Sequence, residues 1–106
     1  EDRLVAAASV FSISRNVSVP WGISTPNEPN ISSTRWRTVA DHKDKLYYFE
    51  SAMTPNVFWV DLKKVDFSPG GGTRVLRLGP NQSRVLAGEA SAQFEAAAPF
   101  RFIALE

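Results

Sequence analysis

The sequence predicts an α+β fold in which an N-terminal helix precedes an antiparallel β-meander. In residues 1–14, apolar side chains recur at helical spacing: Leu4, Val5, Ala7, Ala8 and Phe11. Residues 33–67 hold three β-rich runs separated by two short connectors. With 106 residues, the chain is one small domain or a piece of a larger one.

The expected helix has suitable residues at both ends. Asp2 can cap the first turn, and Arg15 suits the negative C-terminal end of the helix dipole. Residues 16–32 contain three prolines and a glycine, which predict a long loop in place of further helix.

Three strands are expected at Thr34–Asp41, Leu46–Ser51 and Val57–Leu62. In the first strand, alternation places Trp36, Thr38 and Ala40 on one face and Arg35, Arg37 and Val39 on the other. The runs LYYF and VFWV of the other two strands are apolar at every position. Such strands are typical of a sheet that is covered on both faces.

The last third of the chain is less regular. Gly70–Gly72 predicts a turn, and Thr73–Leu78 predicts a fourth strand. The alanine-rich residues Gly88–Ala98 favour a short helix, and Pro99–Leu105 favours a terminal strand or an extended tail.

Composition argues against several classes of function. The formal net charge is +1, which gives no general reason to expect a nucleic-acid partner. No apolar run approaches the roughly 20 residues that span a bilayer, so we expect no membrane partner. The chain has no cysteine, which excludes a thiolate metal site or a thiol nucleophile within these residues.

Most polar residues that could do chemistry lie in expected turns. His42, the sole histidine, lies in a charged connector and is more often a solvated residue there than a base or metal ligand. Four aspartates at turns or strand ends are expected to be turn formers or surface charges: Asp41, Asp44, Asp61 and Asp66. The three glycines lack the remaining residues of a phosphate-binding loop. We therefore predict neither a metal nor a cofactor.

Six aromatic residues lie in the meander: Trp36, Tyr47, Tyr48, Phe49, Phe58 and Trp59. They could form a stacking platform for single-stranded nucleic acid, but only Arg35 and Arg37 flank them. Core packing is the favoured interpretation of all six.

Two ordered segments resemble the C-terminal third of the choloylglycine hydrolase family. DRLVAAASVF resembles the (S/D)RFVRA helix of that family, and STRWRTVADHKDKLYYFESAMTPNVFWVDLKKVDFS resembles its T-x-W-T-x-V-x-D … K-x-Y-Y-(F/Y) hairpin with the following strand. The TPNVFWVDL form is most similar to penicillin V acylase-like members from Gram-negative bacteria. The resemblance covers residues 2 to about 68 well, and PFRF more loosely.

The resemblance implies a linear-amide hydrolase with the αββα sandwich of N-terminal-nucleophile enzymes. Residues 1–106 would be the C-terminal part of that single domain. The family nucleophile is an N-terminal cysteine whose α-amino group handles the proton, and an asparagine with backbone N–H groups holds the oxyanion. Of the catalytic residues of the family, only a later arginine has a counterpart here, Arg3. The second arginine of the helix motif falls on Ala6, so we extend no catalytic role beyond Arg3.

By the same resemblance, the chain alone is expected to be inactive and to need the remaining N-terminal part of the enzyme, as a separate chain or a cleaved piece. The start of the sequence suggests a processed or incomplete chain. A periplasmic or secreted bacterial location is implied, and a homo-oligomer stays open. The substrate also stays open among penicillin V, bile salts and acyl-homoserine lactones. The alternative hypothesis is a non-enzymatic β-rich interaction module, in which the helix face and a sheet edge serve a protein partner.

Overall fold

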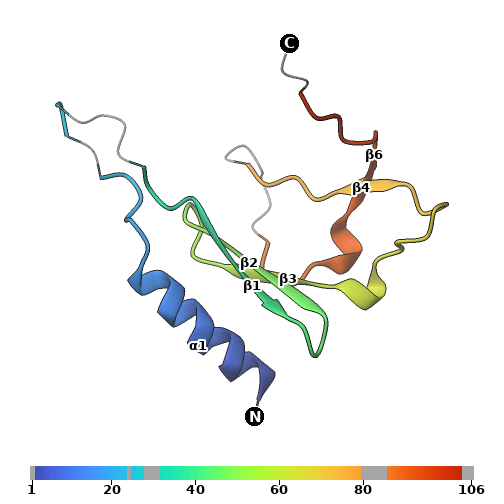
Figure 1. Cartoon of the computed structure of the whole chain (residues 1–106), viewed down its shortest axis with the longest axis horizontal. Coiled ribbons are helices and arrows are strands. Elements are labelled where there is room, and N and C mark those ends of the chain that lie inside the picture. The colour runs from blue at the N-terminus through green and yellow to red at the C-terminus, as the bar shows by residue number, and fades with distance from the viewer. Residues whose placement is uncertain (1, 24, 28–31, 80–85, 104–106) are drawn as a thin grey trace.

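The computed structural model describes residues 2–23, 25–27, 32–79 and 86–103. It contains helix α1 (Arg3–Asn16) and a sheet of β1 (Trp36–Asp41), β2 (Leu46–Ser51), β3 (Val57–Asp61) and β5 (Gly88–Glu89) (Figure 1). A second sheet pairs β4 (Thr73–Val75) with β6 (Glu95–Ala97). Two short 3₁₀ turns complete the described elements, η1 (Leu62–Lys64) and η2 (Ser91–Gln93). The predicted α+β class, a helix followed by antiparallel strands, is confirmed.

Helix α1 begins where the sequence predicts. Asp2 Oδ1 accepts a hydrogen bond from the Leu4 N–H at 2.8 Å, which satisfies one of the free donors of the first turn. Within the helix only Ala7 and Phe11 are buried, whereas Leu4 and Val5 are half exposed. The wider apolar stripe that the sequence predicts is therefore not covered by the described part of this chain.

The meander also forms as predicted. Strands β1, β2 and β3 pair antiparallel in sequence order, and the turn between β1 and β2 uses Lys45 in the left-handed region at φ 58°. Asp41 Oδ1 accepts a hydrogen bond from the Asp44 N–H in this turn at 3.0 Å. Strand β5 joins β3 in parallel, so the four-stranded sheet is mixed.

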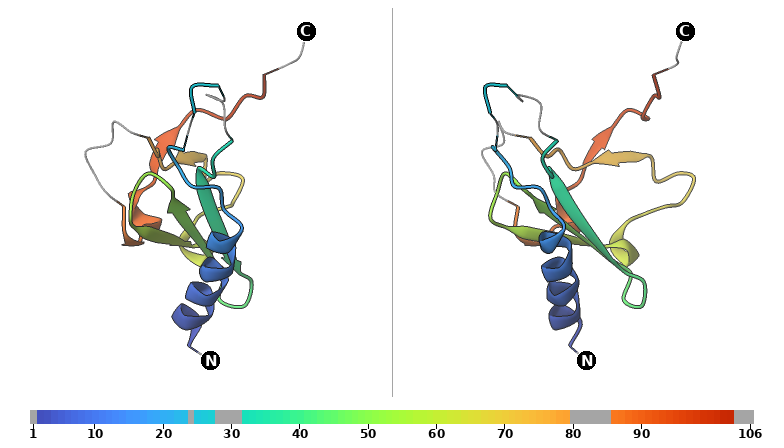
Figure 2. Two further views of the ribbon diagram at one scale, coloured as in Figure 1. Left: turned by 90° about the vertical axis from the view of Figure 1, so that its left-hand side faces the viewer. Right: turned by 60° about the vertical axis from the view of Figure 1, so that its left-hand side comes forward.

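The two faces of the sheet contribute to different cores. Val39, Tyr48 and Trp59 lie in one cross-strand row and face α1. Phe58 and Val60 face the other way and pack with residues of the C-terminal segment, Leu86, Ala90 and Phe94. The sheet thus lies between α1 and the C-terminal elements (Figure 2). Covering on both faces is confirmed for β2 and β3, except at Tyr47.

Two of the six aromatic residues predicted to be core lie at the surface. The Trp36 residue is 59% exposed and Tyr47 is 42% exposed. Both belong to the sheet face opposite α1, where the outer positions of β1 have no covering layer among the described residues. The core prediction is wrong for these two residues.

The helix predicted for Gly88–Ala98 is also wrong. This segment instead forms β5, the turn η2 and β6. Ala90 donates its N–H to the Trp59 carbonyl at 2.9 Å, and β6 pairs with β4, so pairing with distant strands outweighs the helix propensity of alanine. The fourth strand is shorter than predicted and belongs to the second sheet. Residues 99–103 are extended without a strand partner, and residues 104–106 of the expected tail lie outside the described residues.

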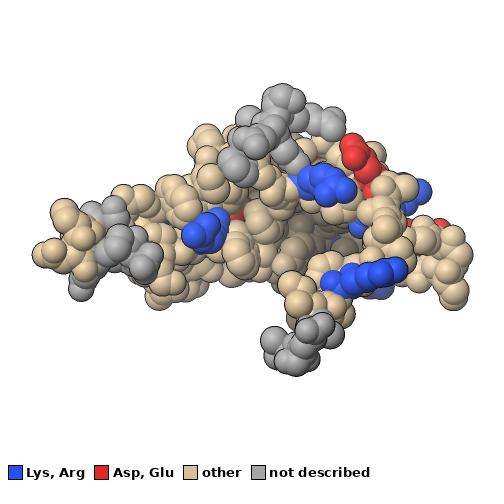
Figure 3. Space-filling model, turned by 90° about the horizontal axis from the view of Figure 1, so that it is seen from above, with Lys and Arg blue, Asp and Glu red and all other residues tan. Residues whose placement is uncertain are grey.

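The chain has an open shape for its length. Its radius of gyration is 16.5 Å, against about 13 Å for a compact domain of this size. Its accessible surface is 8555 Å², against about 5,900 Å² for a compact monomer of this mass. Large apolar side chains contribute to the excess, such as Phe67, Phe100 and Phe102 at 73%, 75% and 88% exposure. On the face that Figure 3 shows, Lys and Arg side chains lie apart from one another, and acidic side chains lie near some of them.

Candidate active site

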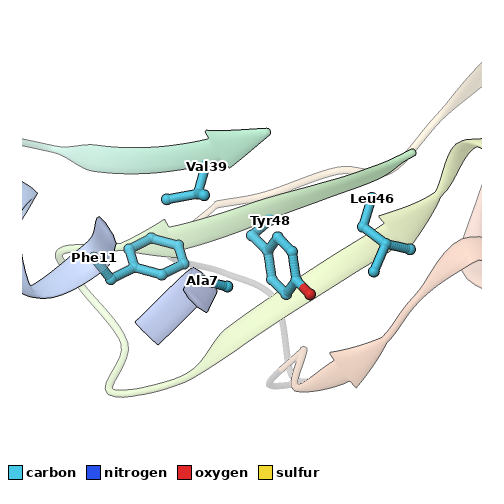
Figure 4. Close-up of a cluster of buried hydrophobic side chains, with 5 residues drawn as sticks. All are labelled: Ala7, Phe11, Val39, Leu46 and Tyr48. Atoms are coloured by element: carbon cyan, nitrogen blue, oxygen red, sulfur yellow. The ribbon is translucent and has the colours of Figure 1, made fainter. Parts of the chain in front are cut away.

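One face of α1 carries Arg3, Ala7, Phe11 and Arg15, each four residues after the last. Ala7 and Phe11 are buried and share a cluster with Val39, Leu46 and Tyr48 (Figure 4). Four helical residues advance about 6 Å and two strand residues advance about 6.7 Å, so a helix can stay nearly in step with a strand beside it. In β2 the alternate residues Leu46, Tyr48 and Glu50 are buried and form the matching row. The apolar pair of α1 is thus flanked by one arginine at each end.

Arg15, at the C-terminal end of this face, forms an ion pair with Glu50. Its Nε donates to both carboxylate oxygens of Glu50 at 3.2 and 3.3 Å, and its Nη2 contacts Oε1. Glu50 is only 8% exposed and also accepts from Arg37 Nη1 at 3.0 Å. Arg37 in turn donates to the Ser18 hydroxyl at 2.7 Å. This network ties the end of α1 to β1 and β2.

The electrostatics of Glu50 agree with a structural ion pair. Burial alone raises the pKa of this carboxyl, but the hydrogen bonds and charges of Arg15 and Arg37 outweigh burial and hold the pKa below its ordinary value. The hydrogen bond with Glu50 also raises the pKa of Arg15. Glu50 is therefore ionised and paired at neutral pH, which does not suit a proton-transfer role.

Arg3, at the N-terminal end of the same face, has different surroundings. It is exposed in the first turn of α1 and forms no ion pair with the residues that the structure describes. The four-residue spacing on α1 places Arg3 beyond Ala7, toward the turn between β1 and β2. Because a guanidinium is charged at every physiological pH, Arg3 offers a fixed positive charge and several donors to a group that arrives from outside this segment.

Tyr48 lies beneath this end of the helix. The residue is 2% exposed, and its ring packs against Phe11 in an edge-to-face contact with centroids 6.4 Å apart. Its hydroxyl is buried and has no hydrogen-bond partner in the part of the chain that the structure describes. Burial raises the pKa of the phenol, and the nearby positive charge of Arg3 opposes that rise.

The remaining polar candidates have the local roles that the sequence predicts. His42 is exposed in the turn after β1. Asp61 Oδ1 accepts from the Lys63 N–H at 3.0 Å, and Asp66 Oδ1 accepts from the Ser68 N–H at 2.9 Å, so both carboxylates hold turns. The described residues contain no group of three or more His, Cys, Asp or Glu that could hold a metal ion. Among them, no helix is long and apolar enough to cross a membrane.

A second charged cluster joins η1 to η2. Glu89 accepts from the Ser91 N–H at 2.8 Å and from Lys64 Nζ at 2.9 Å. The bonds from Ser91, followed by that from Lys64, lower the pKa of Glu89 to about 2. The Ser91 hydroxyl accepts from the Asp61 N–H at 2.8 Å, which links the same turns. These contacts fix the chain around β3 and leave Glu89 ionised at neutral pH.

Sequence reasoning missed Glu50 and the hydroxyl of Tyr48. A period-two signal was available for Glu50, since it follows Leu46 and Tyr48 on one face of β2. A carboxylate on an apolar face requires a cation, and the basic residues of α1 and β1 were the candidates. No sequence signal distinguishes the unpaired Tyr48 hydroxyl from a paired one.

Comparisons with known proteins agree with this arrangement. Residues 2–74 match the family described as linear amide C–N hydrolases, choloylglycine hydrolase family. A penicillin V acylase from Pectobacterium atrosepticum is 60% identical over 99 residues, which are 92% of this chain and 26% of that protein. The solved structure of penicillin V acylase from Agrobacterium tumefaciens superposes with a TM-score of 0.84 at 57% identity, covering 99% of this chain and 33% of that one.

This chain thus spans about a quarter to a third of the length of these two relatives. The matches include the helix that carries Arg3 and the hairpin that it packs against. The chain belongs to the choloylglycine hydrolase family of linear-amide C–N hydrolases.

Proposed function

We propose that this chain is the C-terminal part of a linear-amide hydrolase that cleaves penicillin V. The observation that carries the proposal is 60% identity, over 92% of the chain, to a protein named penicillin V acylase. The similarity to a solved penicillin V acylase over 99% of the chain supports it further.

In the proposed reaction, the nucleophile comes from outside these 106 residues, which contain no cysteine. A cysteine thiolate attacks the amide carbonyl, and the C–N bond breaks as the amine leaves with a proton carried by the α-amino group. Water then cleaves the acyl–enzyme bond. Arg3 contributes a fixed positive charge that favours the thiolate and orients neighbouring carboxylates. Its exposed position at the start of α1, without an ion pair among the described residues, is compatible with this role.

The proposed partner of this segment is the N-terminal part of the same enzyme. Its accessible surface exceeds that of a compact monomer by roughly 2,700 Å². Obligate interfaces bury about 1,000–2,500 Å² on each partner, so an excess of this size is enough for one such interface. The open shape also resembles that of a segment within a longer solved chain. In this proposal residues 1–106 complete an αββα sandwich as part of one domain.

The test is penicillin V hydrolysis by residues 1–106 alone and together with the remaining part of the enzyme. We expect activity only when both parts are present, because the segment supplies Arg3 but no nucleophile. A matched control replaces the N-terminal cysteine of the other part by alanine, which should abolish activity. Hydrolysis by the 106 residues alone would contradict the proposal. A stable monomeric segment that never associates with the other part would favour the interaction-module hypothesis.

A further inference from the structure

A buried hydroxyl without a partner is unusual, because leaving a polar group unpaired in a protein interior costs free energy. The Tyr48 hydroxyl is such a group within the described chain. A phenylalanine would keep the contacts of the ring with Phe11 and Trp59 and avoid that cost. A role for the hydroxyl outside packing would explain its presence.

The position of the hydroxyl narrows the choice of partner. Figure 4 shows the Tyr48 side chain extending past Ala7, with its oxygen on the side away from Phe11. Phe11 and Ala7 are successive steps along the helix face, and the next step toward the N-terminus is Arg3. Helical side chains tilt toward the N-terminus, and Arg3 begins about 6 Å along the axis from Ala7. The hydroxyl therefore lies at the end of the helix face where the arginine begins.

The charges around the phenol agree with this placement. Arg3 is the cation that acts on Tyr48, and the carboxylates of Asp41, Asp44 and Asp2 act on it with the opposite sign. None of these carboxylates forms an ion pair with Arg3 in the described chain. Asp2 and Asp41 already accept backbone N–H groups, whereas the Tyr48 oxygen has no hydrogen-bond partner among the described residues.

We propose that Tyr48 is a positioning residue whose hydroxyl oxygen accepts a hydrogen bond from the Arg3 guanidinium in the complete enzyme. The inference rests on the proposed function, in which Arg3 serves the reaction. Once the rest of the enzyme covers the start of α1, the guanidinium loses water as a partner and needs nearby acceptors. The Tyr48 hydroxyl would satisfy one donor and limit the rotamers of Arg3, and its own unpaired state would end.

The test compares Tyr48→Phe with the unchanged complete enzyme. We expect kcat/KM for penicillin V to fall by about tenfold or more, since a hydrogen bond to a charged group is lost. We expect the thermal midpoint to stay the same or rise slightly, because the ring packing is kept. Tyr47→Phe is the matched control, since Tyr47 precedes Tyr48 but lies half-exposed on the other sheet face. It should change neither quantity.

A double-mutant cycle with Arg3→Ala separates positioning from a general structural role. If Tyr48 acts through Arg3, adding Tyr48→Phe to the Arg3→Ala enzyme should change kcat/KM less than twofold. The inference would be overturned if Tyr48→Phe alone left the rate unchanged, or if it lowered the rate and the thermal midpoint in parallel. Full additivity of the two substitutions in the cycle would overturn it as well. A normal rate in Arg3→Ala would instead count against the catalytic role of Arg3.

A crystal structure of the complete enzyme tests the contact independently of substrate. The proposal requires an Arg3 nitrogen within about 3.2 Å of the Tyr48 oxygen. A different partner on that oxygen would overturn the inference even if penicillin V is the substrate. The contact could equally be present in an enzyme that does not cleave penicillin V, so the two proposals can fail separately.

Discussion

At the scale of single residues, Arg3 and Arg15 occupy equivalent positions on one face of α1 but differ in their partners. Arg15 meets the buried carboxylate of Glu50, and Arg3 meets none among the described residues. Because both arginines continue the same four-residue repeat, helical periodicity cannot distinguish them. The distinction comes from Glu50, 35 residues further along the chain than Arg15.

This difference predicts opposite consequences for two matched substitutions in the complete enzyme. Arg3→Ala should lower kcat/KM by about 100-fold with little change in stability, since it removes a charge near the reaction but no ion pair with the described residues. Arg15→Ala should cost about 1 kcal/mol of unfolding free energy, because the guanidinium is half exposed, and should retain turnover in the folded enzyme. Steady-state kinetics and urea unfolding measure the two quantities. A near-normal rate in Arg3→Ala would return Arg3 to the class of ordinary surface residues.

At the scale of elements, α1 and the β1–β3 meander are the parts that the sequence predicts well. Their signals are local: an aspartate cap, helical spacing, and β-rich runs separated by turn residues. The error at Gly88–Ala98 has the opposite cause. Its conformation depends on β3 and β4, which lie at least 13 residues earlier in the chain, and no local pattern reports such partners.

The network around Glu50 predicts a pH-dependent contribution to stability. The folded-state pKa lies below the ordinary value of 4.5, so the contribution is present above that value and is lost as pH falls through the folded pKa. At pH 7, Glu50→Gln should cost about 2 kcal/mol of unfolding free energy, because the largely buried Arg37 loses its carboxylate.

Denaturant unfolding of the complete enzyme at pH 7 and at about pH 3.5 measures this contribution. The difference between wild type and Glu50→Gln should shrink at the lower pH, because the carboxyl of the unfolded chain, with its ordinary pKa of 4.5, is then largely protonated. Glu95→Gln is a suitable control, since Glu95 is exposed on β6 and should show a small effect at both pH values. A constant difference would show that Glu50 does not titrate as the network implies.

At the scale of the whole molecule, the sequence identifies the family but does not indicate how open the segment is. The stretches that carry the resemblance form α1 and the meander, whereas the C-terminal residues are exposed and have no covering layer among the described residues. Core predictions failed at Trp36 and Tyr47 because the part of their sheet face that lies over β1 and the adjoining end of β2 has no cover in the described chain. An aromatic residue in the sequence predicts burial, but it does not indicate which segment of polypeptide covers it.

The exposed tail gives a prediction at this scale. In the segment itself Phe102 is 88% exposed and has an aromatic contact with Phe100. If the rest of the enzyme covers it, Phe102→Ser should cost about 2 kcal/mol in the complete enzyme, since an apolar side chain would lose its burial. Arg101→Gln is the control, because neighbouring side chains of an extended chain point to opposite sides. Equal thermal midpoints for both variants and wild type would show that Phe102 stays in solvent.

The residues of α1 and β2 that face each other recur at similar but unequal axial distances. Four residues add about 6 Å along the helix and two residues add about 6.7 Å along the strand, so the offset between facing residues grows by roughly 0.7 Å at each such step. The matching row on β2 begins at Leu46, the first residue of that strand, so Arg3 lies one helical step beyond the last strand residue of the row. Arg15 therefore has a carboxylate of β2 opposite it, whereas Arg3 has no β2 residue opposite it. A one-residue deletion in the middle of α1 would turn the positions before it by about 100° and remove both relations at once.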